Sequence, residues 1–504
     1  MFYHSEIVYQ PWIRLIAITL NILLLTLFLF PLTLIASRST NTIGVVIARI
    51  GFLGVTLVPL NMVRNLLGLS LFSLSEKLNR LLLLGMALFI LILVVLAFIR
   101  FGLRRITEST ITLFLILSPC LLVFYGQAIW QAMKYENSKP LASPARGAQK
   151  NRIVWVIFDE LDQHLAFVNR PPSLHLPEFD RLRGEALVAT NAVAPADETL
   201  LSLPSLTIGR LVDKAEPISE DELAIRFHKS GETAHWSTQP TIFSQAREKG
   251  QNTAIIGWYL PYCRLFNRVT TKCYGDSARN MVDSRDERII YNMLQLSASS
   301  LEAVPLVKRL SGMRLQSIPR GDAETVEGLI LSYVGLLKES LSAVADPNLG
   351  LIFVHLSVPH PPTFFDREAG VFSSRKANSY LDGLALADRT LGDIRHAMEG
   401  AGVWDDTVVL ISSDHPWRRN MWYGKKYYFN EEDESLIVSE NQRRVPFILK
   451  LAGQSKAKVY ESSFNTVLSK DLLLAIMQGE VANSESVVEW LETSKTRFAF
   501  DMAK

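Results

Sequence analysis

The 504-residue sequence contains little cysteine and almost no net charge, and both shortages exclude classes of function. Three cysteines are too few for a disulfide scaffold or for a cysteine-rich zinc or iron–sulfur site. Aspartate, glutamate, histidine and hydroxyl groups remain as metal ligands. With 52 basic and 50 acidic residues, the net charge of +2 provides no general field for nucleic acid. We therefore expect no nucleic-acid partner.

Charged residues are missing altogether from segments 15–37, 81–99 and 109–133. About 20 apolar residues in a helix are enough to cross a hydrocarbon core about 30 Å thick. We therefore predict a transmembrane domain over residues 1–135. Its four helices are expected at 13–37, 43–64, 80–100 and 107–130. Arg49 interrupts the second one, and it either snorkels to the membrane surface or faces a lipid headgroup.

The basic residues between the expected helices give conflicting signals about orientation. Arg100, Arg104 and Arg105 favour a cytoplasmic third loop, whereas Arg64 and Lys77 favour a cytoplasmic second loop. We adopt the first arrangement because the resemblance described below agrees with it. It places the C-terminal part outside the cytoplasm, on a bacterial inner or plasma membrane.

The C-terminal part alternates apolar segments of strand length with amphipathic segments of helical length. After a linker at 136–150, continuous apolar runs occur at 153–158, 253–257, 351–356 and 407–412. Helical spacing occurs at 242–249 and 380–398. This alternation predicts an α/β doubly wound domain whose parallel strands are buried on both faces. We place it at 151–480 and expect a C-terminal tail at 481–504.

Polar residues follow three of these four apolar runs. They are Asp159, Glu160 and Asp162 after the first run, His355 and His360 at the third, and Asp414 and His415 after the fourth. Each residue alone has a simple explanation as a helix cap or an ordinary histidine. Ligands of such sheets bind beyond the carboxyl ends of the strands. The mixture of carboxylates and imidazoles at three strand ends therefore predicts a site for one divalent metal, Zn²⁺ or else Mn²⁺.

A candidate nucleophile lies in the segment 196–210, ADETLLSLPSLTIGR. Thr199 and Ser202 precede an apolar stretch, as expected for hydroxyl groups near the N-terminus of a helix. Free N–H groups and the helix dipole there favour an anion such as phosphate or sulfate. The alternative is that Thr199 only caps the helix.

Five motifs occur in one order between about residues 151 and 450: VIFDELD, ETLLSLPSLTIG, FVHLSVPHPP, VVLISSDH and RRVPFIL. In this combination the sequence resembles the alkaline phosphatase superfamily. Within that superfamily it resembles the sulfatase-like branch of membrane-anchored enzymes, which includes phosphoethanolamine transferases and lipoteichoic acid synthases. The resemblance implies an alkaline phosphatase/sulfatase-like fold behind a membrane anchor.

The resemblance also implies roles for particular residues. Thr199 stands where the Thr-x-x-Ser-x-Pro segment of the transferases carries the nucleophile. Asp159, Asp414 and His415 match the residues that bind zinc together with that threonine. His355 and His360 match a His-x4-His segment. Its second histidine, His360, faces the second-metal or substrate side and can act as an acid or a base.

The sequence departs from the family after the Asp-His pair. No histidine follows His415, and Pro416, Trp417 and Arg418 replace the usual Gly-Glu. Whether the site binds a second metal is therefore left open. Basic residues of this segment either substitute for a second cation or form a solvated loop; they are Arg418, Arg419, Lys425 and Lys426. Formylglycine chemistry is disfavoured because Leu206 stands where a sulfatase requires arginine.

We expect a membrane-anchored, metal-dependent enzyme that cleaves a phosphoester through a covalent phospho-threonine. It would move a phospholipid headgroup of the phosphoethanolamine or phosphoglycerol type to a lipid or glycan acceptor. The alternatives are a phosphoester or sulfate-ester hydrolase without an acceptor, and an inactive membrane-bound binding protein. Several aromatic residues are candidates for an acceptor site or for ordinary packing; they are Trp258, Tyr259, Tyr262, Trp417, Trp422 and Tyr423. The oligomeric state is not predicted.

Two of the three cysteines lie in one loop-like stretch, YCRLFNRVTTKCYG. Cys120 lies within an apolar segment, so Cys263 and Cys273 are the plausible disulfide pair. An extracytoplasmic location permits this disulfide. The alternative is two free thiols.

Overall fold

The computed structural model describes residues 151–219, 222–276, 326–373, 378–423, 428–436 and 443–497, and scattered residues between Ile16 and Trp130. Contacts divide the chain into two compact units, and residues 138–282 and 322–504 belong to the larger one. Among the described residues, no helix combines the length and the hydropathy required to cross a membrane. The expected span at 80–100 and the linker at 136–150 lie outside the described residues, as do most residues of the other three spans.

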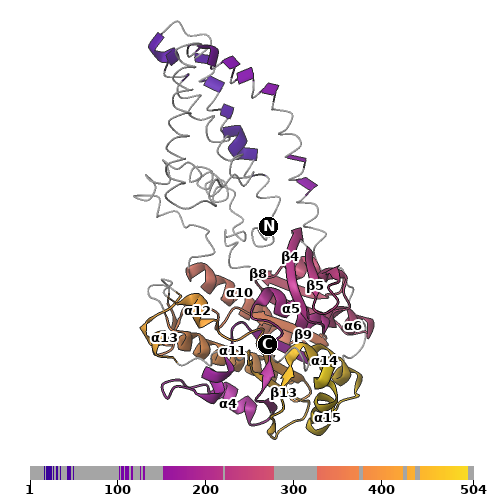
Figure 1. Cartoon of the computed structure of the whole chain (residues 1–504). Coiled ribbons are helices and arrows are strands. Elements are labelled where there is room, and N and C mark those ends of the chain that lie inside the picture. Colours follow the sequence, from indigo (N-terminus) through magenta and orange to yellow (C-terminus); the bar gives the residue numbers. More distant parts are fainter. Residues whose placement is uncertain are drawn as a thin grey trace. The chain divides into compact units, whose positions relative to one another are not determined.

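An eight-stranded sheet forms the centre of the larger unit (Figure 1). In order across the sheet, the strands are β14 (Lys458–Tyr460), β2 (Leu187–Ala189), β13 (Phe447–Lys450), β12 (Val408–Ser412), β1 (Ile153–Phe158), β9 (Leu351–Leu356), β7 (Thr253–Trp258) and β8 (Lys272–Asp276). The five strands from β12 to β8 are parallel. The predicted doubly wound α/β fold is therefore confirmed, and each of the four apolar runs forms one of these strands. The antiparallel strand β13, which pairs with both β12 and β2, was not predicted.

Helices cover both faces of the sheet, as the continuous apolar character of its strands requires (Figure 1). One face packs against α4 (Pro177–Arg183), α10 (Val326–Val344) and α11 (Tyr380–Gly400). The other packs against α5 (Thr199–Ile208), α6 (Ile242–Glu248), α14 (Ser469–Gln478) and α15 (Ser484–Ser494). Along β1, Val154 and Val156 face the first layer, whereas Ile153 and Trp155 face the second. The predicted segments 242–249 and 380–398 correspond to α6 and α11.

Smaller elements complete the unit. A three-stranded antiparallel sheet contains β4 (Val212–Ser219), β5 (Glu222–Phe227) and β6 (Thr233–His235). Two-stranded pairs join β10 (Phe365–Asp366) to β11 (Val371–Phe372) and β3 (Ala192–Val193) to β15 (Phe464–Asn465). The short helices are α7 (Tyr262–Leu265), α12 (Arg419–Trp422) and α13 (Glu431–Ser435), the π-helix His164–Val168, and the 3-10 turns Trp236–Thr238 and Thr466–Leu468.

The segment expected to form a C-terminal tail contributes α15 to the domain. Val487 and Leu491 of this helix are fully buried in the core. Asn483 begins the helix with a capping box, in which its side chain accepts from the backbone N–H of Ser486.

The predicted disulfide between Cys263 and Cys273 is confirmed. It joins α7 to strand β8 at the edge of the sheet. The adjacent Tyr262 lies beside Gly257 of β7 and His355 of β9.

Candidate metal and nucleophile site

Two buried carboxylates lie at the carboxyl ends of neighbouring parallel strands. Asp159 follows β1 and Asp414 lies two residues after β12. Oδ1 of Asp414 accepts hydrogen bonds from the backbone N–H groups of His415 (2.9 Å) and Glu160 (3.3 Å). By contrast, Oδ1 of Asp159 and Oδ2 of Asp414 have no hydrogen-bond partner among the described residues. Each carboxylate therefore presents one buried oxygen that no described residue hydrogen-bonds.

His415 completes this group. Its Nε2 lies 3.3 Å from Oδ2 of Asp414 and 3.7 Å from Oδ1 of Asp159. Its other ring nitrogen, Nδ1, lies 3.1 Å from the carbonyl oxygen of Pro416. A carbonyl can only accept, so Nδ1 carries a proton, and Nε2 is the nitrogen that a metal would use. Burial lowers the pKa of His415, but Asp414 and Asp159 outweigh burial and raise it.

Thr199, the first residue of α5, places its hydroxyl group on the same atoms. The Thr199 hydroxyl donates to Oδ2 of Asp159 at 3.4 Å, and its oxygen lies 3.1 Å from Nε2 of His415. Ser202 lies one helical turn later, fully buried, and its hydroxyl donates to the carbonyl of Ala196 at 3.2 Å. Only Thr199 of the two hydroxyl residues therefore contacts the buried group.

The chemistry of this group fits a divalent metal. The ligand atoms of Asp159, Asp414 and His415 lie within 4.8 Å of one another, and all three residues are buried. Carboxylate oxygens with an imidazole nitrogen, and a hydroxyl oxygen beside them, form the mixed set that Zn²⁺ accepts. The predicted ligands Asp159, Thr199, Asp414 and His415 are thus brought together.

The pKa shifts of the two carboxyl groups also favour a bound cation. Burial raises the pKa of Asp159, but the neighbouring imidazoles, with His360 first, outweigh burial and hold it well below its usual value. Burial, followed by the charge of Asp159, raises the pKa of Asp414. Two carboxylates this close and this deeply buried repel each other, and a cation between them relieves that repulsion.

Trp258 orients Asp159, and Tyr262 orients the neighbouring His355. The indole N–H of Trp258, the last residue of β7, donates to Oδ2 of Asp159 at 3.2 Å. His355, fully buried in β9, has its Nε2 3.7 Å from the same oxygen and its Nδ1 2.9 Å from the hydroxyl of Tyr262. Oδ2 is therefore occupied by protein groups, which leaves Oδ1 of Asp159 for a metal.

His360 lies between two tryptophans. Its ring meets those of Trp258 and Trp422 edge to face, with centroids 5.3 and 5.0 Å away. Its Nε2 is 4.0 Å from Oε1 of Glu160, and its side chain is partly exposed. His360 therefore lies beside Glu160, the residue that follows the candidate ligand Asp159.

Arg418 also lies at the site, through Glu160. Its Nε donates to Oε1 of the fully buried Glu160 at 2.7 Å, and the indole of Trp422 donates to Oε2 at 2.9 Å. Sequence reasoning placed Glu160 at the strand end without assigning it a role. Its position directly after Asp159, at the end of a continuous apolar run, was the available signal.

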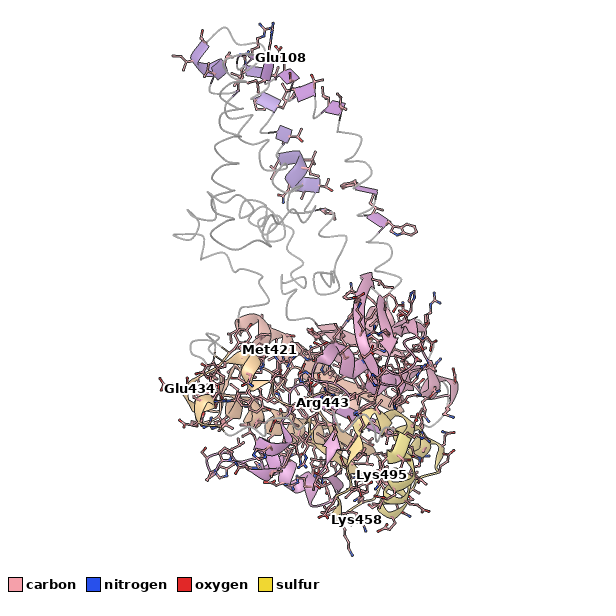
Figure 2. The ribbon with its side chains drawn as sticks, viewed as in Figure 1. Glu108, Met421, Glu434, Arg443, Lys458 and Lys495 are labelled. Carbon is pink, nitrogen blue, oxygen red and sulfur yellow. A yellow bond between two sulfur atoms is a disulfide. The ribbon has the colours of Figure 1, made fainter. Side chains whose placement is uncertain are left out.

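The other basic candidates do not share this position. Arg419 donates to the backbone carbonyls of Asp433 and Glu434, at 3.2 and 2.9 Å. Lys425 and Lys426 lie outside the described residues. Arg443 of the RRVPFIL motif is labelled in Figure 2. It pairs with Asp197, two residues before Thr199, at 2.8 Å.

The aromatic candidates for an acceptor site have different surroundings. Trp258 and Trp422 flank His360, and Tyr262 contacts His355. Trp417 is instead stacked on Tyr380, with ring centroids 4.2 Å apart. Tyr259 packs against Trp258, and Tyr423 is 61% exposed.

Comparison with known proteins identifies the family. The sequence profile of the family described as Sulfatase matches residues 151–478, which is more than half of the chain. The chain belongs to the sulfatase family. It is accordingly an enzyme of the hydrolase type in the alkaline phosphatase superfamily, as its motifs predict. Among curated proteins, no sequence matches this sulfatase-family chain.

Solved structures similar to this sulfatase-family chain include the PsFucS1 sulfatase from Pseudoalteromonas sp., at 15% identity and a TM-score of 0.44, over 65% of this chain and 68% of that one. Another is the phosphonate monoester hydrolase of Agrobacterium radiobacter, at 13% identity and a TM-score of 0.41, over 65% and 74%. A third is a protein in the alkaline phosphatase superfamily from Vibrio parahaemolyticus, at 14% identity and a TM-score of 0.40, over 66% and 68%.

Proposed function

We propose that this sulfatase-family enzyme is a membrane-anchored phosphoester transferase. It would cleave a phospholipid headgroup through a covalent phospho-threonine at Thr199 and pass the phosphoryl-bearing group to a lipid or glycan alcohol. Zn²⁺, or else Mn²⁺, is the expected cofactor. The ion would be held by Asp159, Asp414 and His415.

The observation that carries the proposal is the position of the Thr199 hydroxyl. It is the one hydroxyl of the Thr-x-x-Ser segment that lies against the candidate metal ligands, 3.1 Å from His415. A threonine hydroxyl is a weak nucleophile unless its proton is made easier to remove. A bound divalent ion would lower the pKa of that hydroxyl and offset charge on the transferring group.

The chain's own residues supply the remaining chemistry. In the first step Oγ of Thr199 forms a bond to phosphorus while the ester bond to the donor alcohol breaks. The hydroxyl proton of Thr199 leaves, and the departing alcohol gains one, for which His360 is the candidate donor. In the second step an acceptor hydroxyl forms a bond to phosphorus and gives its proton to His360, while the bond between phosphorus and Oγ of Thr199 breaks and Thr199 regains its proton.

A lipid donor is favoured by the predicted membrane spans. Four apolar segments ahead of the domain would hold it beside a surface where headgroup-bearing lipids are concentrated in two dimensions. Transfer requires an acceptor alcohol to compete with water at roughly 55 M, which demands a site that positions the acceptor. Trp258 and Trp422, on either side of His360, are candidate walls of that site.

The test follows a headgroup label. The full-length enzyme is incubated in vesicles with a headgroup-labelled phospholipid and a candidate acceptor lipid, and the products are separated. Label on a second lipid or glycan is the expected result. Label released only as a free phosphoester, whatever acceptor is added, would identify a hydrolase. No release and no transfer under any metal condition would favour the binding-protein alternative. A Thr199→Ala variant is the matched blank.

A further inference from the structure

We propose that Arg418, held through its Nε by Glu160, binds a non-bridging oxygen of the transferred group and supplies the fixed positive charge opposite the metal ligands. This inference deepens the proposed function and rests on it, since it assumes that an anionic ester is bound at Thr199. It makes Arg418 a determinant of the charge that the substrate carries.

The first argument is how Arg418 is attached. Both carboxylate oxygens of Glu160 are used, Oε1 by Nε of Arg418 and Oε2 by the indole of Trp422. The guanidinium is thus fixed through its inner nitrogen. Its terminal amino groups make no hydrogen bond to any described residue, although only 24% of the side chain is exposed. They form the planar donor pair that suits a phosphate or sulfate oxygen.

The second argument is how Glu160 is held. Its backbone has a φ of +62°, a left-handed conformation that is unfavourable for a residue with a Cβ. Hydrogen bonds fix it there: its N–H donates to Asp414 at 3.3 Å, and its carbonyl accepts from the hydroxyl of Tyr380. Such conformations occur where the surrounding structure requires them, often at functional sites. The backbone of the residue that holds Arg418 is therefore hydrogen-bonded to a candidate metal ligand.

The third argument is energetic. Removing two charges from water costs free energy that a single ion pair does not reliably recover, so a buried pair is weak support for stability. Here Glu160 is fully buried, and Arg418 keeps terminal N–H groups that donate to no described residue. That arrangement is poor for stability and well suited to binding an anion. The acidic groups nearby, with Glu160 first, raise the pKa of Arg418 against the effect of burial.

Counting formal charges gives the substrate class. A divalent ion would be offset by Asp159 and Asp414, and Arg418 is offset by Glu160. The pocket is then close to neutral before Thr199 loses its proton. A singly charged ester, such as a phosphodiester or a sulfate monoester, is expected to bind better than a doubly charged phosphate monoester, because no surplus cation receives the second charge.

The experiment compares Arg418→Gln and Arg418→Lys with the control Arg419→Gln in the full-length, metal-loaded protein. Arg419 is the neighbouring arginine, and its hydrogen bonds go to backbone carbonyls outside the site. Binding of methyl sulfate, a sulfate ester with a single negative charge, is measured by calorimetry, and metal content by elemental analysis. The kcat/KM is measured for methyl p-nitrophenyl phosphate, which is singly charged, and for p-nitrophenyl phosphate, which is doubly charged.

Both Arg418 variants should keep their metal and bind methyl sulfate about 10- to 100-fold more weakly, as expected for a lost charge-assisted contact. Lysine is included because its single amino group cannot pair with Glu160 and also present a planar donor pair. The wild type should prefer the singly charged ester, and kcat/KM for that ester should fall by about the same factor in both variants. Arg419→Gln should match the wild type.

Wild-type affinity for methyl sulfate in either folded Arg418 variant would overturn the proposal, as would a wild-type preference for the doubly charged ester. Failure of the proposed function gives a different pattern. If binding of methyl sulfate depends on Arg418 but no covalent adduct forms on Thr199, the anion site stands and the phospho-threonine mechanism does not.

Discussion

Gly257 in strand β7 provides a sharp test of how the site is packed. A Cβ at this position would lie 2.4 and 2.5 Å from Cε2 and Cδ2 of Tyr262, whereas carbon atoms in contact are about 3.5–4.0 Å apart. The ring of Tyr262 is fully buried and meets Trp236 and Phe353 edge to face, so it cannot swing away freely. Gly257→Ala therefore forces the ring to shift by about 1 Å.

That shift has two costs. Overpacking a core typically costs about 1–3 kcal/mol. The 2.9 Å hydrogen bond between Tyr262 and Nδ1 of His355 would also be lost, which adds about 1 kcal/mol. We expect Gly257→Ala to lower the free energy of unfolding by about 2–4 kcal/mol, measured by denaturant titration of the purified protein.

Gly275 is the matched control, because it is the register partner of Gly257 in strand β8. A Cβ on Gly275 would lie 3.6 Å from the sulfur of Cys263, an ordinary contact. Gly275→Ala should change stability by less than about 1 kcal/mol. Equal stability of the two variants would refute the packing argument and, with it, the view that Tyr262 is held rigidly against His355.

Three further predictions concern the disulfide, a buried carboxyl and the metal. Cys263 and Cys273 are ten residues apart, and replacing both with alanine should lower the free energy of unfolding by about 2.7 kcal/mol in the chain-entropy model. Unchanged stability of this double variant would contradict the prediction. Asp388 accepts hydrogen bonds from the first backbone N–H groups of α4, and burial raises its pKa to about 6. Protonation of Asp388 therefore stabilises the fold. This stabilisation is complete below about pH 4 and is lost as the pH rises through about 6. Relative to wild type, Asp388→Asn should therefore gain about 1–2 kcal/mol of stability between pH 4 and pH 7, and a pH-independent difference would exclude the effect. Purified wild-type protein should contain about one divalent ion per chain, and the Asp414→Asn variant should lack it. A strong chelator should lower the Tm of the wild type. Full metal retention in Asp414→Asn would refute the site.

The core of the fold was predictable because its strands are continuous apolar runs. Segments such as IVWVIF are buried on both faces and so carry a strong signal, and 153–158 and 351–356 are strands with those bounds. The shortest strands of the sheet were not predictable in the same way. β2 and β14 have three residues each, too few for periodicity to define them.

The site was predictable where its residues directly follow strands, since topology alone brings Asp159, Asp414 and His415 to one edge of the sheet. The side chains that hold these residues and Arg418 in place were not predictable from the sequence. That Glu160 holds Arg418 depends on a left-handed backbone conformation at Glu160, which no composition or spacing indicates. The contact from Tyr262 to His355 likewise joins residues 93 positions apart.

The central claim is a covalent intermediate on Thr199, and trapping it is the most direct test. Metal-loaded wild type is mixed with a labelled phospholipid, quenched in acid within one turnover, digested and analysed by peptide mass spectrometry. We predict a phosphoryl-bearing adduct on Thr199 that is absent from Thr199→Ala and retained in Ser202→Ala. An adduct on Ser202, or turnover with no adduct at any quench time, would contradict this account.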